Sequence, residues 1–71
     1  MRYKVYIKSI STDPWGEPVL DDDSGQYAKS FSYDQCGVHG MYSIVVDTET
    51  NLVIFEDGYP LAVDCEFEGE A

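Results

Sequence analysis

Three consecutive carboxylates, Asp21, Asp22 and Asp23, are the densest group of chemically active side chains in the sequence. Carboxylates in a loop can bind Ca²⁺, but an EF-hand loop needs acids at alternating positions, a central glycine and a glutamate at its twelfth position. That spacing is absent, so we expect no metal and no cofactor. A solvated turn that caps a helix and a site for a basic partner both remain open.

Cys36 and His39 form the other pair with catalytic potential, because a histidine can activate a cysteine thiol. They are three residues apart and no third group that would orient the histidine is evident. The sequence also lacks a Ser-His-Asp order, a phosphate loop and a defensible pair of catalytic carboxylates. We therefore expect that the protein is not an enzyme. Cys36 and Cys65 could form a disulfide, although reduced thiols fit a reducing compartment better.

Charge is the most distinctive property of the chain, whose 71 residues carry fourteen acids, four bases and a net charge of −10. Three of the bases lie in the first eight residues, so the part from Ser9 onward has one lysine and all fourteen acids. With 44 % hydrophobic and 14 % aromatic residues, the composition is that of a folded domain. Direct binding to nucleic acid or to an anionic membrane is disfavoured, and a basic protein partner is favoured.

Trp15 and the pair Glu56 and Asp57 complete the candidate binding residues. Trp15 lies in an acidic loop, and an exposed aromatic ring among carboxylates suits an interface with an arginine-rich surface. Trp15 can equally belong to the core. We predict partner binding by Trp15, Asp21, Asp22, Asp23, Glu56 and Asp57.

The last strand places four acids on one face, at alternating positions about 6.7 Å apart. This is half the charge density of one DNA strand, which carries one phosphate per about 3.4 Å. We favour ion pairs with basic residues of the first strand as the role of these acids over imitation of a phosphate backbone. The acids are Asp64, Glu66, Glu68 and Glu70, and the bases are Arg2, Lys4 and Lys8.

The elements that must position these residues form one α+β domain, residues 1–71. Alternation predicts strands at 2–10, 41–47, 52–56 and 59–67, with 11–25 as a loop that holds a short extended piece at 18–20. Asp57-Gly58 predicts a hairpin turn. We expect an antiparallel sheet of about four strands with one short helix on one face.

Residues 26–36 can be read as helix or strand, and we favour helix. Asp23 would cap it with Gln26 in a capping box, Tyr27, Ala28 and Phe31 would form its buried stripe, and Cys36-Gly37 would end it. The last strand would bury one row of side chains: Tyr59, Leu61, Val63, Cys65 and Phe67. In the first strand, Tyr3, Val5 and Ile7 would face the core, and Arg2, Lys4, Tyr6 and Lys8 would face outward.

The net charge can be compared with that of a DNA duplex as long as the domain. A chain of this length should have a radius of gyration near 11 Å and be about 29 Å across. A duplex of that length carries about 17 phosphates, which is the same order as the net charge. No apolar run approaches the roughly 20 residues of a membrane span, and the first residues do not form a secretion signal, so we expect a cytoplasmic protein.

Three stretches resemble phage-encoded anti-CRISPR proteins directed at type I-F surveillance complexes. MRYKVYIKSI (1–10) is similar to that family's first strand, QCGVHG (35–40) to its helix exit, and EDGYPLAVDC (56–65) to its final hairpin. The resemblance implies the fold. It implies no contact residues, because the compared proteins carry lysines where this chain carries acids.

Charge, size and resemblance together predict a stoichiometric inhibitor of a host defence complex, encoded by a phage or mobile element. Its carboxylates would occupy a basic nucleic-acid-binding surface as a DNA mimic, and its partner would be a nucleic-acid-binding protein or a CRISPR effector complex. The alternative is a small acidic interaction or structural module, without an inhibitory role, that self-associates through an exposed edge strand. The protein would be a monomer or a homodimer.

Overall fold

The structure is a computed structural model that describes residues 1–67. Glu68 and Glu70, predicted for the outer face of the last strand, lie outside the described residues. The described part has a radius of gyration of 10.7 Å and extents of 27 × 24 × 23 Å, as the chain length predicts.

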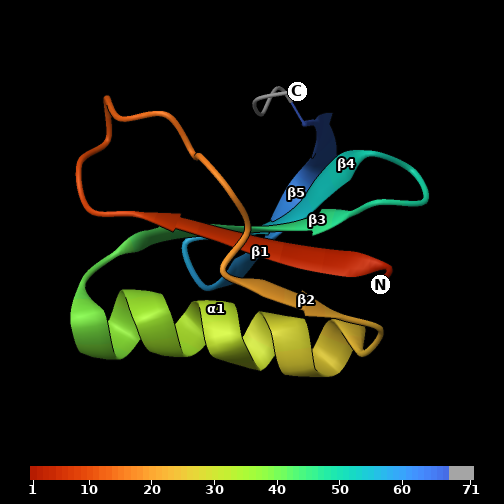
Figure 1. The fold of residues 1–71 in the computed structure, drawn as a ribbon, viewed down its shortest axis with the longest axis horizontal. Helices are drawn as coiled ribbons and strands as arrows, with labels where there is room; N and C mark the ends of the chain where they lie inside the picture. Colours follow the sequence, from red (N-terminus) through yellow and green to blue (C-terminus); the bar gives the residue numbers. More distant parts are fainter. Residues whose placement is uncertain (68–71) are drawn as a thin grey trace.

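One helix packs on a five-stranded antiparallel sheet, which confirms the α+β class (Figure 1). The strand order is β2-β1-β3-β4-β5. Five strands are present where about four are predicted, because residues 20–22, in the segment predicted as a loop, form a strand, β2, that pairs with β1. This strand overlaps the extended piece predicted at 18–20 only at Leu20. The elements are β1 (Tyr3–Lys8), β2 (Leu20–Asp22), α1 (Gly25–His39), β3 (Tyr42–Asp47), β4 (Leu52–Glu56) and β5 (Tyr59–Glu66).

The central strand β3 is buried on both faces, so the domain has two small cores. On the helix side Val45 pairs with Val5 and Phe55, and Ala28 of α1 covers them. On the opposite face, which we call the back face, Ile44, Val46, Val53 and Tyr6 form the second cluster, with Trp15, Leu61 and Phe67 packed against it. Tyr6, predicted to face outward, is therefore buried. The prediction was wrong because it assigned the sheet a single apolar face.

The boundaries of α1 differ from those predicted, and the differences have local causes. Ser24, not Asp23, is the N-cap: its hydroxyl accepts the Tyr27 N–H at 3.2 Å. Asp23 instead accepts the Arg2 N–H at 3.0 Å. The helix continues through Gly37 and ends at Gly40, whose φ of 66° forms the left-handed cap that glycine tolerates best.

The buried stripe of α1 is more polar than the predicted one. Tyr27 is 53 % exposed, whereas Ala28 and Ser32 are fully buried. The Ser32 hydroxyl contacts that of Ser43 in β3, and the Cys36 Sγ lies 3.1 Å from the same Ser43 oxygen. Small side chains let the helix approach β3 closely, and these contacts satisfy their polar atoms.

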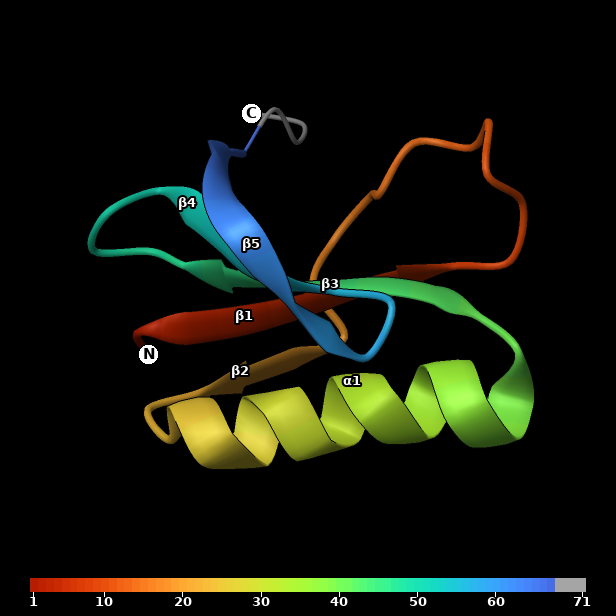
Figure 2. The ribbon, with the colours of Figure 1, turned by 180° about the vertical axis from the view of Figure 1, so that it is seen from behind.

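The last strand, β5, lies at the edge of the sheet, and Figure 2 shows it twisting across the other strands. Its pairing with β4 shifts register between Val53 and Phe55. The prediction that one row of its side chains is buried was wrong for Tyr59, Val63 and Cys65, which are exposed. Leu61 is half-buried on the back face, and so is Phe67 just beyond the strand. An edge strand has a neighbour on one side only, so fewer atoms cover it.

Ser24→Ala is expected to lower the free energy of unfolding by about 1 kcal/mol, because it removes an N-cap acceptor. Ser30→Ala is the matched control: Ser30 is exposed on α1, and alanine is a better helix former there. Urea unfolding followed by circular dichroism measures both. Equal stability of the two variants would contradict the assigned cap.

Candidate functional site

The three consecutive aspartates lie at the edge strand β2 and in the turn before α1, and each contacts another part of the chain. The Asp21 Oδ1 is 3.4 Å from the N-terminal ammonium group. The Asp22 Oδ1 accepts the Ser24 N–H at 2.7 Å, and Asp23 holds the Arg2 backbone. We call these three residues the β2 acidic region. Its members are exposed or half-buried, but two of them also fix the chain at the start of the helix.

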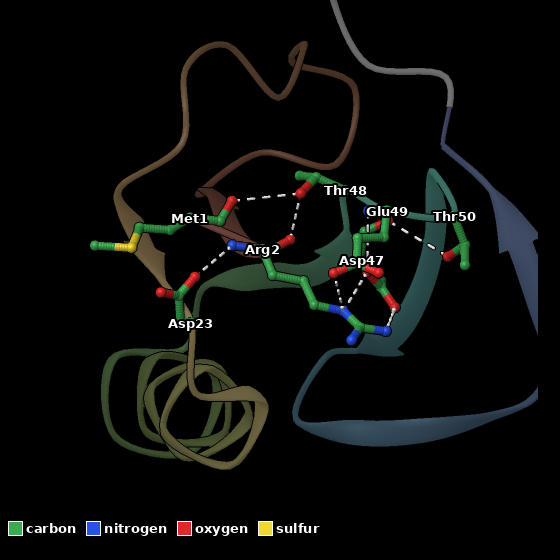
Figure 3. A network of polar contacts seen from close by, with 7 residues as sticks. All are labelled: Met1, Arg2, Asp23, Asp47, Thr48, Glu49 and Thr50. Atoms are coloured by element: carbon green, nitrogen blue, oxygen red, sulfur yellow. Dashed lines mark hydrogen bonds and ion pairs between the residues drawn. The ribbon is translucent and has the colours of Figure 1, made fainter.

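Arg2 is bound within the protein and does not reach β5 (Figure 3). Its Nε and Nη2 donate to the two carboxylate oxygens of Asp47 at 3.0 and 2.9 Å, and Glu49 lies at 3.5 Å. The predicted ion pairs between the first and last strands were wrong, because β3 and β4 separate those strands.

Asp47 is the one buried acid among the described residues, with 6 % of its surface exposed. The hydrogen bonds from the Arg2 guanidinium hold the pKa of its carboxyl below the ordinary value, against the opposing effect of burial. The Asp47 Oδ1 also accepts the Glu49 N–H at 3.1 Å, which fixes the β3–β4 turn. These contacts stabilise the fold and leave the Asp47 carboxylate unavailable to a partner.

Trp15, Glu56 and Asp57 line one hollow together, and we call them the tryptophan region. Two hollows of about 190 and 240 Å³ share Trp15 and Glu56 as lining residues, and Asp57 lines the larger one. Trp15 is half-buried, with the Lys8 Nζ 4.1 Å from its ring centre. Lys8 also donates to the Asp13 carbonyl at 3.1 Å. Trp15 packs against the back-face cluster and is still partly exposed, so its predicted core role is confirmed, whereas its role in partner binding stays a prediction.

Asp57 has a structural role as well. It has a φ of 52° and is followed by Gly58 with a φ of 86°, which confirms the predicted hairpin turn. Its N–H donates to the Ser43 carbonyl at 2.7 Å, and its Oδ1 accepts the Ser43 N–H at 3.2 Å. Glu56 is therefore the better residue of this pair for contact with another molecule.

A groove of about 770 Å³ lies beside α1 and was not predicted from the sequence. Tyr3, Lys29, Tyr33 and Phe55 line it, and the Lys29 Nζ lies 6.0 Å from the centre of the Phe55 ring. The exposed rings of Tyr33 and Tyr59 meet edge to face at 5.9 Å at this side of the domain. Its lining comes from β1, α1 and β4, so no local pattern could have revealed it.

Within residues 1–67, no cluster of three or more histidine, cysteine or acidic side chains could hold a metal ion. Cys36 and Cys65 are free thiols. No helix in this part of the chain is long and apolar enough to cross a membrane. The Cys36 contacts are with serine and not with His39, which is exposed.

The fold defines a small two-layer α+β domain. Of the six predicted binding residues, three line one hollow (Trp15, Glu56 and Asp57). The other three, Asp21, Asp22 and Asp23, lie in the edge strand β2 and in the turn that follows it. Comparison of the chain with protein-family models, with curated proteins and with solved structures finds no match. The resemblance to anti-CRISPR proteins therefore stays a prediction. What the geometry offers chemically is binding through carboxylates and one accessible indole ring.

Proposed function

We propose that this protein is a stoichiometric inhibitor of a host defence complex, encoded by a phage or mobile element in the manner of anti-CRISPR proteins. Its exposed carboxylates would occupy a lysine- and arginine-lined surface that normally receives nucleic acid. Attraction between the acidic protein and the basic surface would speed their association, and binding would release counterions, as it does when the surface binds nucleic acid.

The observation that carries this proposal is the unequal placement of the two kinds of charge. Of the twelve acids in residues 1–67, eleven are exposed or half-buried, and only Asp47 is buried. Two of the four bases are held by contacts within the protein, Arg2 by Asp47 and Lys8 by Trp15. Most of the acids are thus accessible to a partner, whereas two of the four bases already have partners within the protein.

The dimensions of the domain also support the proposal. A DNA duplex as long as the 27 Å longest extent carries about 16 phosphates, at one per about 1.7 Å. The net charge of −10 is of the same order. A basic groove that fits a duplex would therefore meet a comparable charge over a comparable length.

The direct test is capture from a bacterial lysate with tagged protein at low and high salt, followed by competition with nucleic acid. The proposal expects a nucleic-acid-binding defence complex that is recovered at low salt, is lost at high salt and is displaced by its own nucleic acid. If the complex is recovered but its nucleic acid does not displace the protein, the protein does not occupy the nucleic-acid site.

Glu56→Lys is expected to weaken this binding at least about ten-fold, because it places a like charge against a basic surface. Asp34→Lys makes the same change in net charge on the exposed face of α1 and is the matched control. Affinity for the captured complex, measured by surface plasmon resonance, compares the two. Equal weakening would mean that net charge alone matters and that the tryptophan region is not the contact.

Asp21→Asn tests whether the β2 acidic region contacts the same partner. It is better suited than reversal of all three aspartates, because Asp22 and Asp23 also hold the backbone.

The second candidate function is a self-associating module, and the exposed edge strand β5 favours it. This strand carries the exposed residues Asp64 and Glu66, so two copies of β5 paired at their edges would bring like charges together. Analytical ultracentrifugation at low and high salt separates the two functions. A dimer that persists at both salt concentrations would favour the module over the inhibitor.

A further inference from the structure

We propose that the smaller hollow beside Trp15 is a receptor for an arginine side chain of a partner protein. This inference rests on the proposed function, since it names the chemistry by which a basic partner would be held. The hollow has a volume of about 190 Å³, several times the 30 Å³ share of one water molecule. It is therefore large enough for the head group of a long side chain.

The walls of this hollow combine the two features that a guanidinium group needs. Two aromatic residues, Trp15 and Phe67, line it, and so do two acidic residues, Glu56 at the end of β4 and Glu66 at the end of β5. Ile44 and Val53 form an apolar floor. Arginine is planar, stacks on aromatic rings and donates hydrogen bonds to carboxylates, whereas lysine is a strongly hydrated point charge. None of the described residues that line the hollow is basic.

The Phe67 wall is held in place by contacts away from the hollow. The Phe67 ring lies 4.9 Å from that of Tyr6, at an interplanar angle of 31°. The Phe67 N–H donates to the Asn51 carbonyl at 3.0 Å, which ties the end of β5 to the β3–β4 turn. A receptor fixed in this way loses little conformational freedom when a ligand binds.

The protein already shows the same mode of binding next to this hollow. The Lys8 ammonium lies 4.1 Å from the centre of the Trp15 ring, in the larger hollow that also has Glu56 and Asp57 in its lining. The indole ring therefore accepts a cation with carboxylates nearby. The smaller hollow repeats this combination of ring and carboxylate without a cation of its own in its described lining.

The test is an NMR titration of the isolated protein with the peptide Ac-Gly-Arg-Gly-NH2. Its counterpart with citrulline, which is neutral and nearly identical in shape, is the ligand control. Trp15 is the only tryptophan, so its indole N–H gives one unambiguous signal. We expect the arginine peptide to shift that signal and the amides of Glu66 and Phe67, and the citrulline peptide to leave them in place.

Glu66→Gln is expected to weaken binding of the arginine peptide about three- to five-fold, the effect of losing one exposed ion pair. Asp34→Asn removes the same charge from α1 and should leave the affinity unchanged. Shifts confined to residues outside the hollow, or equal responses to both peptides, would overturn the receptor. The titration needs no partner, so its failure would leave the proposed function to be decided by the lysate capture.

Discussion

Asp47→Asn is expected to lower the free energy of unfolding by about 2–3 kcal/mol, or the melting temperature by roughly 10–20 °C. The change removes the charge of a buried carboxylate that accepts two hydrogen bonds from Arg2. The estimate lies below the ~3–5 kcal/mol of a fully buried pair because the Arg2 side chain is 40 % exposed and can be hydrated. Thermal and urea unfolding at pH 7 measure the loss.

The same pair predicts a pH dependence of a definite sign. The folded-state pKa of Asp47 is lowered from its ordinary value of 3.8, so the unfolded chain takes up the proton first as the pH falls. Its stabilisation is complete above about pH 5 and decreases as the pH drops through 3.8 toward the folded-state pKa. The stability difference between the wild type and Asp47→Asn should therefore shrink in acid. A difference that stays constant from pH 7 to pH 2.5 would contradict this assignment.

Glu49→Gln is the matched control for Asp47. Glu49 pairs with the same arginine at 3.5 Å, but its side chain is 65 % exposed. Exposed ion pairs contribute little, so we expect a loss below about 0.5 kcal/mol. Similar losses in the two variants would mean that burial is not the reason for the stability of this network.

Gly58→Ala is expected to lower the free energy of unfolding by roughly 2–4 kcal/mol, because two costs add at this position. Gly58 has a φ of 86°, which side chains of L-residues rarely adopt. An added Cβ would also lie 3.3 Å from the Tyr33 Cα and 3.4 Å from its ring. The β4–β5 turn would have to move away from α1. Denaturant unfolding measures the loss.

Gly16→Ala separates these two costs. Gly16 has a φ of 69°, but nothing lies within 4 Å of the position of its added Cβ. We expect this variant to lose about 1 kcal/mol, the backbone cost alone. If Gly58→Ala and Gly16→Ala were equally destabilised, the close approach of the turn to Tyr33 would have no energetic importance.

Local sequence patterns predicted where the strands and the helix lie better than they predicted which side chains are buried. Alternation located β1, β3, β4 and β5, and the Asp57-Gly58 pair predicted the turn between the last two, because these signals act between near neighbours in sequence. The end of α1 was predicted too early. Gly37 could have ended the helix, but the helix continues past it to His39, where Gly40 caps it. Three-residue β2 was too short to give a pattern of its own, and it forms because β1 offers it a free edge.

The candidate site shows a similar division. The residue types were predicted, but Asp22, Asp23 and Asp57 turned out to hold backbone groups that no sequence pattern indicates. Glu66 and Phe67 were not predicted as companions of Trp15, because the loop that carries Trp15 reaches the end of β5 only in the folded chain.

Composition and short-range periodicity in the sequence were enough to predict the α+β class and the excess of negative charge. The tertiary structure decided which charges stay available. Strand order separates the basic first strand from β5 and places Arg2 against Asp47. It also buries both faces of β3 and brings Trp15 beside Glu56. These outcomes depend on pairing between distant segments, whose register is set by the packing of the whole domain.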